Sequence, residues 1–140
     1  MNKTVIANDP FETEEVGIEL AAELRNGMVV SLIGSLGAGK TTFAKGIAKG
    51  LLITDVVVSP SYVIARTYAG RIPMHHIDAY RVSSLDELEE AGLTDYLPPD
   101  LGVSVVEWPE RIDGLIEASA IEVRFELLES NSRRIHVSQP

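Results

Sequence analysis

Residues 34–42 read GSLGAGKTT and follow directly on the apolar run MVVSLI of residues 28–33. The first eight residues, 34–41, fit the pattern G-x-x-x-x-G-K-[ST] at every fixed position. In such a loop the glycines let backbone N–H groups point inward at phosphate oxygens, and the next helix presents its positive dipole end to the same anion. The stretch therefore predicts a buried strand over 29–33, a phosphate-binding loop, and a helix over 41–49 that ends at Gly50.

The side chains of this loop indicate a magnesium–nucleotide complex. Lys40 is placed to reach the β- and γ-phosphates and Thr41 to ligate Mg²⁺, while Thr42 either contacts the α-phosphate or caps the helix. The chain carries no N/T-K-x-D signature of guanine recognition, so ATP is favoured over GTP. The candidate nucleotide-binding residues of the loop are Ser35, Leu36, Gly37, Ala38, Gly39, Lys40, Thr41 and Thr42.

The segments around the loop predict an α/β fold. A strand is expected over 3–7, followed by a helix that Asp9 caps and Gly27 ends. Residues 62–68 and 72–77 read as a β-hairpin, and Ser84 with Glu87 forms a capping box for a helix that ends at Gly92. Further strands are expected over 103–106, 121–127 and 134–137. These elements predict one three-layer domain over 1–140, with parallel central strands and antiparallel edge hairpins.

Two carboxylates follow buried strands and are candidates for hydrolysis. Asp78 ends the apolar part of MHHIDAYR, and Glu107 ends the strand of VSVVEWPE. Parallel strands bring their C-terminal ends to the same crevice, where Mg²⁺ or an attacking water needs a carboxylate. The alternative is that each acid caps its strand and faces water. His75 and His76 are adjacent on a strand and face opposite ways, so at least one is expected to be structural.

Composition and charge narrow the class of protein. The chain has 140 residues, a formal net charge of −9 and no cysteine, which excludes disulfides and thiolate metal sites. No signal peptide or membrane-spanning run is visible, so a cytoplasmic protein is expected. Residues 82–110 carry eight acidic residues and no Lys or Arg, so strong direct binding of nucleic acid is not expected. This acidic stretch is either a solvated helix face or a docking surface for a basic partner.

The ordered motifs GSLGAGKTT, SPSY, HIDAYR, ELEEAGLTDYL and VVEWPER resemble the TsaE family, also called YjeE. The resemblance implies a P-loop NTPase fold and a small ATPase of bacterial tRNA threonylcarbamoyladenosine biosynthesis. It also implies that Glu107 binds Mg²⁺ or polarises water, that Asp78 belongs to a second switch, and that Thr13 lies near the adenine. The first switch would be Ser59, Pro60 and Ser61, where the family usually has threonine in place of Ser61.

The family resemblance also implies partners. TsaE proteins act with TsaD and TsaB, which handle the tRNA, and the acidic segment 84–92 becomes a candidate docking surface for them. Activity in isolation is expected to be slow because no arginine finger is evident, with Arg81 and Arg111 as the candidates. The alternatives are a small-molecule kinase, although no Arg-rich lid is visible, and a nucleotide-dependent binding module that does not hydrolyse ATP.

Overall fold

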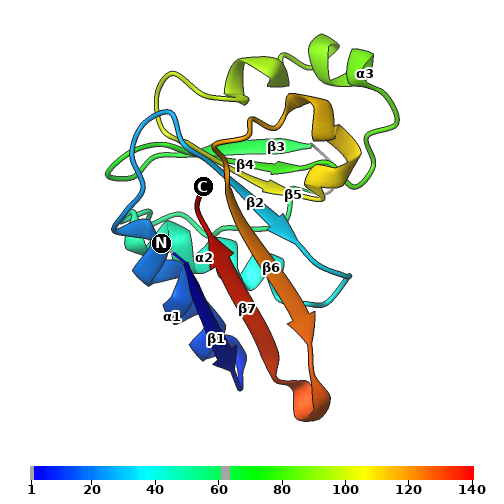
Figure 1. Ribbon diagram of the computed structural model, residues 1–140. Coiled ribbons are helices and arrows are strands. Elements are labelled where there is room, and N and C mark those ends of the chain that lie inside the picture. The colour runs from blue at the N-terminus through cyan, green and yellow to red at the C-terminus, as the bar shows by residue number, and fades with distance from the viewer. Residues whose placement is uncertain (1, 61–63) are drawn as a thin grey trace.

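The computed structural model describes residues 2–60 and 64–140, which form a seven-stranded mixed sheet beside a pair of packed helices (Figure 1). The strand order is β1-β7-β6-β2-β5-β4-β3. The four neighbours β6, β2, β5 and β4 are parallel, while β1 with β7, β7 with β6, and β3 with β4 are antiparallel. The strands are β1 Lys3–Ala7, β2 Val29–Ile33, β3 Ala65–Tyr68, β4 Met74–Asp78, β5 Val103–Glu107, β6 Ile121–Leu127 and β7 Arg133–Ser138.

One face of the sheet is covered by two helices, α1 (Pro10–Ala21) and α2 (Lys40–Gly50). The buried residues Leu20 of α1 and Ile47 of α2 belong to the same hydrophobic cluster as Val105 of β5 and Ile135 of β7. The two helices cross closely, because a methyl group on Gly46 would lie 2.1 Å from the carbonyl oxygen of Glu14. This pair fixes the start of α2, where the glycine-rich loop ends, against the sheet.

The opposite face of the sheet is covered over only half of its width. The short helix α3 (Leu85–Glu90) and the 3₁₀ helices η1 (Leu93–Tyr96) and η2 (Pro109–Leu115) pack there against β2, β4 and β5. On β6, β7 and β1 the outward side chains are exposed or half-buried instead, among them Arg124, Arg134, His136 and Ile6. The third layer is therefore built from short segments and leaves one half of the sheet facing solvent.

The sequence-based fold prediction is confirmed in class and in most elements. Strands 3–7, 29–33 and 121–127 have the predicted bounds, and Asp9 and Ser84 cap their helices as expected. Helix α1, however, ends at Ala21 rather than near Gly27. After Ala21 the chain continues in turns, in which the N–H groups of Glu23 and Leu24 donate to the carbonyl oxygens of the residues three positions earlier. Leu24 is still buried in this turn.

The predicted hairpin is correct in pairing but not in bounds. The strand expected over 62–68 begins at Ala65, and residues 62 and 63 lie outside the described part. The backbone of Ile64 has a left-handed φ of 62°, which is not a strand conformation, so β3 is short. The second strand runs from Met74 to Asp78 rather than over 72–77. In the described ranges 2–60 and 64–140, no helix is long and apolar enough to cross a membrane.

Candidate functional site

The glycine-rich loop, residues 34–39, connects β2 to α2 at the C-terminal end of the parallel strands. Gly37 and Gly39 have φ values of 77° and 104°, which other residues rarely adopt, so these two positions require glycine. Gly39 occupies the N-cap position of α2 without a side-chain cap. The first turn of α2 therefore has backbone N–H groups that are free to donate hydrogen bonds to an anion.

Lys40 is the first residue of α2 and is a buried residue beside the loop. Its Nζ donates a hydrogen bond of 2.7 Å to the carbonyl oxygen of Gly34 and lies 3.5 Å from the ring centroid of Trp108. Burial lowers the pKa of Lys40 below its usual value, while the nearby carboxylates Glu107, Glu110 and Asp78 act in the opposite direction without outweighing it. The ammonium group of Lys40 therefore lies in surroundings in which an anionic partner would stabilise its charge.

The two candidate carboxylates end neighbouring parallel strands, as the sequence predicts. Asp78 and Glu107 are register partners in β4 and β5, and both are buried. Thr41 Oγ1 lies 3.2 Å from each carboxylate oxygen of Glu107. Asp78 Oδ1 accepts a 2.9 Å bond from the backbone N–H of Tyr80. A hydroxyl and a carboxylate from different elements therefore meet at the start of α2.

Trp108 follows Glu107 in the sequence, and its indole ring covers the ammonium group of Lys40. Its backbone is left-handed, with φ 59° and ψ 50°, which costs a residue with a Cβ on the order of 1 kcal/mol. This turn carries the indole back over Lys40 and against Tyr80, with ring centroids 4.9 Å apart. Arg111 in turn lies 5.6 Å from the Tyr80 ring centroid. The strained turn thus places an aromatic cover on the lysine.

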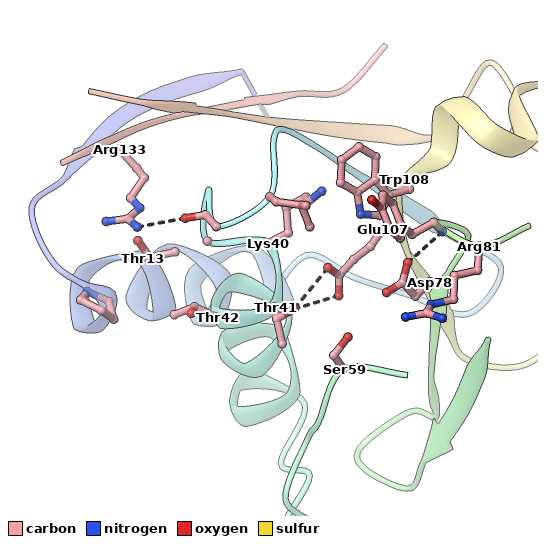
Figure 2. A pocket seen from close by; sticks show the side chains of 15 residues that line it. Thr13, Lys40, Thr41, Thr42, Ser59, Asp78, Arg81, Glu107, Trp108 and Arg133 are labelled. Atoms are coloured by element: carbon pink, nitrogen blue, oxygen red, sulfur yellow. Dashed lines mark hydrogen bonds between the residues drawn. The ribbon is translucent and has the colours of Figure 1, made fainter. Parts of the chain in front are cut away.

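These residues surround a cavity of about 460 Å³, drawn close up in Figure 2. Thr13 and Arg133 lie at one end of the cavity, Asp78, Arg81 and Trp108 lie at the other, and Lys40 and Thr41 lie between them. Lining residues that the sequence singled out as site candidates are Thr13, Leu36, Gly37, Gly39, Lys40, Thr41, Thr42, Ser59, Asp78 and Glu107.

Three candidates among the described residues, Ser35, Ala38 and Pro60, do not line the cavity. Ser35 and Ala38 shape the loop, since the Ala38 N–H donates to the Ser35 carbonyl at 3.2 Å and Ala38 is fully buried. Pro60 is buried beside Ser59 and does not line the cavity. Ser61, the third residue of the predicted switch, lies outside the described residues. The described part of this segment therefore contributes one hydroxyl, that of Ser59.

Arg133 is a charged cavity residue that the sequence did not indicate. It starts β7 and donates from Nη2 to the carbonyl oxygen of Gly37 at 3.0 Å, with a second bond to the carbonyl of Asn131. Pro10 and Tyr80 also line the cavity. No local pattern marks Arg133, because its position beside the loop arises from the pairing of β7 with β1 and β6.

The oxygen atoms of the site suit a magnesium ion whose other ligands come from a bound phosphate group and water. Among residues 2–60 and 64–140, no three His, Asp or Glu side chains gather so that they could hold a metal by themselves. The hydroxyl of half-buried Thr41 and the carboxylate of buried Glu107 nevertheless form an adjacent pair of oxygen atoms, and Mg²⁺ typically takes one or two such groups together with substrate phosphates and waters. The residues present therefore fit Mg²⁺ in company with a phosphate.

Known proteins resemble this chain in sequence and in fold. The profile of the family "Threonylcarbamoyl adenosine biosynthesis protein TsaE" matches residues 7–135. A Bacillus subtilis tRNA threonylcarbamoyladenosine biosynthesis protein TsaE is 38% identical over 128 residues, which cover 91% of this chain and 79% of that protein. The Treponema pallidum protein of the same name is 34% identical over 133 residues, covering 95% and 98%.

A solved structure agrees with the sequence relatives. The crystal structure of YdiB from Bacillus subtilis superposes with a TM-score of 0.81 at 32% identity and covers 100% of this chain and 88% of its own. The match includes the mixed sheet and the glycine-rich loop region, since the whole chain is covered. The chain belongs to the TsaE family of threonylcarbamoyl adenosine biosynthesis proteins.

Proposed function

We propose that this chain binds ATP with Mg²⁺, hydrolyses it, and thereby supports threonylcarbamoyladenosine modification of tRNA together with TsaD and TsaB. The observation that carries the proposal is the meeting of Lys40, Thr41 and Glu107 at one end of the parallel strands, around a cavity of about 460 Å³. Two elements distant in sequence meet there: α2 supplies a cation and a hydroxyl, and β5 supplies a carboxylate. The family names of the relatives give the pathway.

The proposed binding mode follows from the order of groups along the cavity. The triphosphate lies along the glycine-rich loop, with Lys40 and the N–H groups of the first turn of α2 as its partners. The adenine lies toward α1, where Thr13 and Arg133 line the cavity. A phosphate competes with the Trp108 ring for the Lys40 ammonium, so binding changes the surroundings of the single tryptophan.

The proposed hydrolytic role falls to the carboxylates. Thr41 Oγ1 and Glu107 hold Mg²⁺, which when bound neutralises developing charge on the phosphate oxygens. Glu107 also accepts a hydrogen bond from an attacking water, and Asp78 beside it orients this network through the C-terminal end of β4. Ser59 lies at the edge of the cavity and belongs to the segment that senses the nucleotide.

Nucleotide binding is tested by the fluorescence of Trp108 during titration with ATP and Mg²⁺. We expect Lys40→Ala to abolish the signal, because it removes the phosphate's charge partner. Lys45→Ala is the matched control, since Lys45 is exposed on the next turn of α2 and does not line the cavity. Wild-type affinity in Lys40→Ala would refute the binding mode.

Hydrolysis is tested by phosphate release with and without TsaD and TsaB. We expect slow release from the isolated chain and faster release with the partners. Glu107→Gln should bind ATP but lose hydrolysis by roughly 100-fold or more, whereas Glu23→Gln, which changes an exposed carboxylate that does not line the cavity, should hydrolyse normally. Phosphate found on a metabolite would instead indicate a kinase, and binding without turnover under all conditions would indicate a binding module.

The pathway role is tested in cells that depend on this chain. Depletion should lower threonylcarbamoyladenosine in tRNA, and Lys40→Ala should fail to restore it. Unchanged modification would refute the pathway role while leaving the nucleotide site intact.

The acidic face of α3 is the proposed docking surface for TsaD and TsaB. Glu89 and Glu90 are exposed there, whereas Leu88 packs into the core. Reversal of both charges to lysine should weaken binding to the partners and make it less sensitive to salt. Unchanged binding would exclude α3 as the docking surface.

A further inference from the structure

Two adjacent histidines of β4, His75 and His76, are both buried but lie on opposite faces of the sheet. His75 bonds to Thr67 Oγ1 at 2.9 Å and to the carbonyl oxygen of Leu101 at 2.8 Å. Its ring stacks on Tyr96 with centroids 4.3 Å apart. Both ring nitrogens are thus used to join β4 to neighbouring segments, so His75 stabilises the fold away from the cavity.

His76 makes a different set of contacts. Its side chain is 0% exposed, and its Nε2 lies 2.6 Å from Oε2 of Glu107. Its Nδ1 has no hydrogen-bond partner among the described residues. An ionised carboxylate only accepts hydrogen bonds, so Nε2 carries the hydrogen, and a buried Nδ1 costs less as a bare lone pair than as an unpaired N–H. His76 is therefore a donor directed at one atom, Glu107 Oε2.

The bond to His76 is the shortest that Glu107 makes within the described structure. The two contacts of Glu107 with Thr41 Oγ1 are longer, at 3.2 Å each. Glu107 is only 4% exposed, so few water molecules can compete with His76 and Thr41 for hydrogen bonds to its carboxylate. His76 approaches from within the sheet, on the strand next to Glu107, and Thr41 approaches from α2. The Glu107 carboxylate therefore lies between the Nε2–H group of His76 and the hydroxyl of Thr41 on α2.

We propose that His76 is a positioning residue for Glu107. Its Nε2–H holds the carboxylate in the orientation that faces Thr41 and so prepares the pair of oxygen ligands for the divalent cation of a bound nucleotide. Metal-ligand carboxylates are commonly oriented by such buried partners. The cation part rests on the proposed function, whereas the orientation of Glu107 is a property of the chain itself.

The test compares two amide variants that differ by one methylene. His76→Gln carries its amide nitrogen at the position of Nε2 and keeps the donor to Glu107. His76→Asn is too short to reach Glu107 and loses it. His76→Leu removes the donor at similar volume. His75→Asn is the matched control, because it disrupts a buried histidine on the same strand that has no contact with Glu107.

Two measurements are made on the full chain. The first is a crystal structure of each variant without metal or nucleotide, in which the orientation of Glu107 toward Thr41 is read directly. The second measures ATP affinity by Trp108 fluorescence at increasing Mg²⁺ concentrations, starting from the affinity in EDTA. The quantity compared between variants is the Mg²⁺ concentration at which half of the gain in ATP affinity is reached. Neither measurement needs hydrolysis.

We expect His76→Asn and His76→Leu to turn the carboxylate away from Thr41 and to raise the half-saturating Mg²⁺ concentration about 10- to 100-fold. ATP affinity in EDTA should change less than about twofold, because Lys40 and the loop are untouched. His76→Gln should restore both properties, and His75→Asn should lower the melting temperature without changing either one.

Other results overturn the proposal. An unchanged Glu107 orientation in His76→Asn would show that Thr41 and the backbone suffice to place the carboxylate. Equal losses of affinity with Mg²⁺ and in EDTA would show that His76 only maintains the fold. If the wild-type chain gains no ATP affinity from Mg²⁺, the proposed function fails, and the crystal structures still decide whether His76 positions Glu107. If His76→Leu does not fold, the Gln and Asn pair carries the comparison.

Discussion

The crossing of α1 and α2 allows a prediction whose magnitude can be worked from distances. We consider Gly46→Ala. A methyl group at this position would lie 2.1 Å from the carbonyl oxygen of Glu14, whereas ordinary contact begins at 3.4 Å. Because the obstacle is backbone, no side-chain rotation relieves the clash, and the helices must separate by roughly 1 Å. Gly17, across the same crossing, has a similar conflict with the carbonyl oxygen of Phe43 at 2.5 Å.

The free energy of unfolding should fall despite the better helix propensity of alanine. Overpacking a close contact costs about 1–3 kcal/mol, and a backbone clash belongs at the upper end. Alanine in place of glycine returns about 1 kcal/mol within a helix. The net loss is about 2 kcal/mol, which for a chain of this length corresponds to a fall of about 7 °C in Tm.

The assay is thermal and urea unfolding followed by circular dichroism, with Gly114→Ala as control. Apart from the two chain neighbours of Gly114, no atom of the described residues lies within 4 Å of a methyl group at this position, so this variant should unfold like the wild type. ATP affinity of Gly46→Ala should also fall, because α1 carries Thr13 to the cavity. If Gly46→Ala is as stable as the wild type or more stable, the close crossing of the two helices is wrong.

Three further predictions concern single side chains. Asp9→Ala removes the cap that accepts a 2.8 Å bond from the Glu12 N–H, so Tm should fall by about 3 °C in a thermal melt. Because burial lowers the pKa of Lys40, the unfolded chain binds this proton more tightly. Lys40→Met should therefore melt no lower than the wild type near neutral pH, and any advantage should shrink as the pH rises and vanish only above the ordinary lysine pKa of 10.5, where both states of the wild type have released the proton. A constant difference in Tm across that range would contradict this. Arg133→Ala should weaken ATP binding about tenfold by fluorescence titration, as expected for one charge-assisted bond. Arg134→Ala, which removes an exposed arginine paired with Glu126 on the outer side of β7, should bind normally.

Local sequence signals were sufficient where a short segment determines its own structure. Strand β2, the glycine-rich loop and α2 follow from β-branched residues, glycines and apolar spacing within about twenty residues, and the structure has them in place. The end of α1 could not be predicted this way. Leu24 continues the helical spacing and is buried, but it reaches the core from a turn rather than from a helix. Periodicity reports burial and does not distinguish these two routes.

The site was predictable to the extent that its residues lie at strand ends. Asp78 and Glu107 were indicated because parallel strands end together, and the structure has them as register partners. Arg133 and the bond between His76 and Glu107 depend on which strands become neighbours, which no single segment specifies.

The half-covered sheet has a consequence for hydrogen exchange. Backbone amides of β2, β4 and β5 lie between two layers, whereas those of β6, β7 and β1 are covered on one face only. Local opening should therefore begin at β1 and β7 and reach β5 last. The cavity spans this gradient, since Arg133 belongs to the weakly protected half and Glu107 to the strongly protected half. The chain can thus release one wall of its cavity by partial unfolding while its carboxylates stay in register.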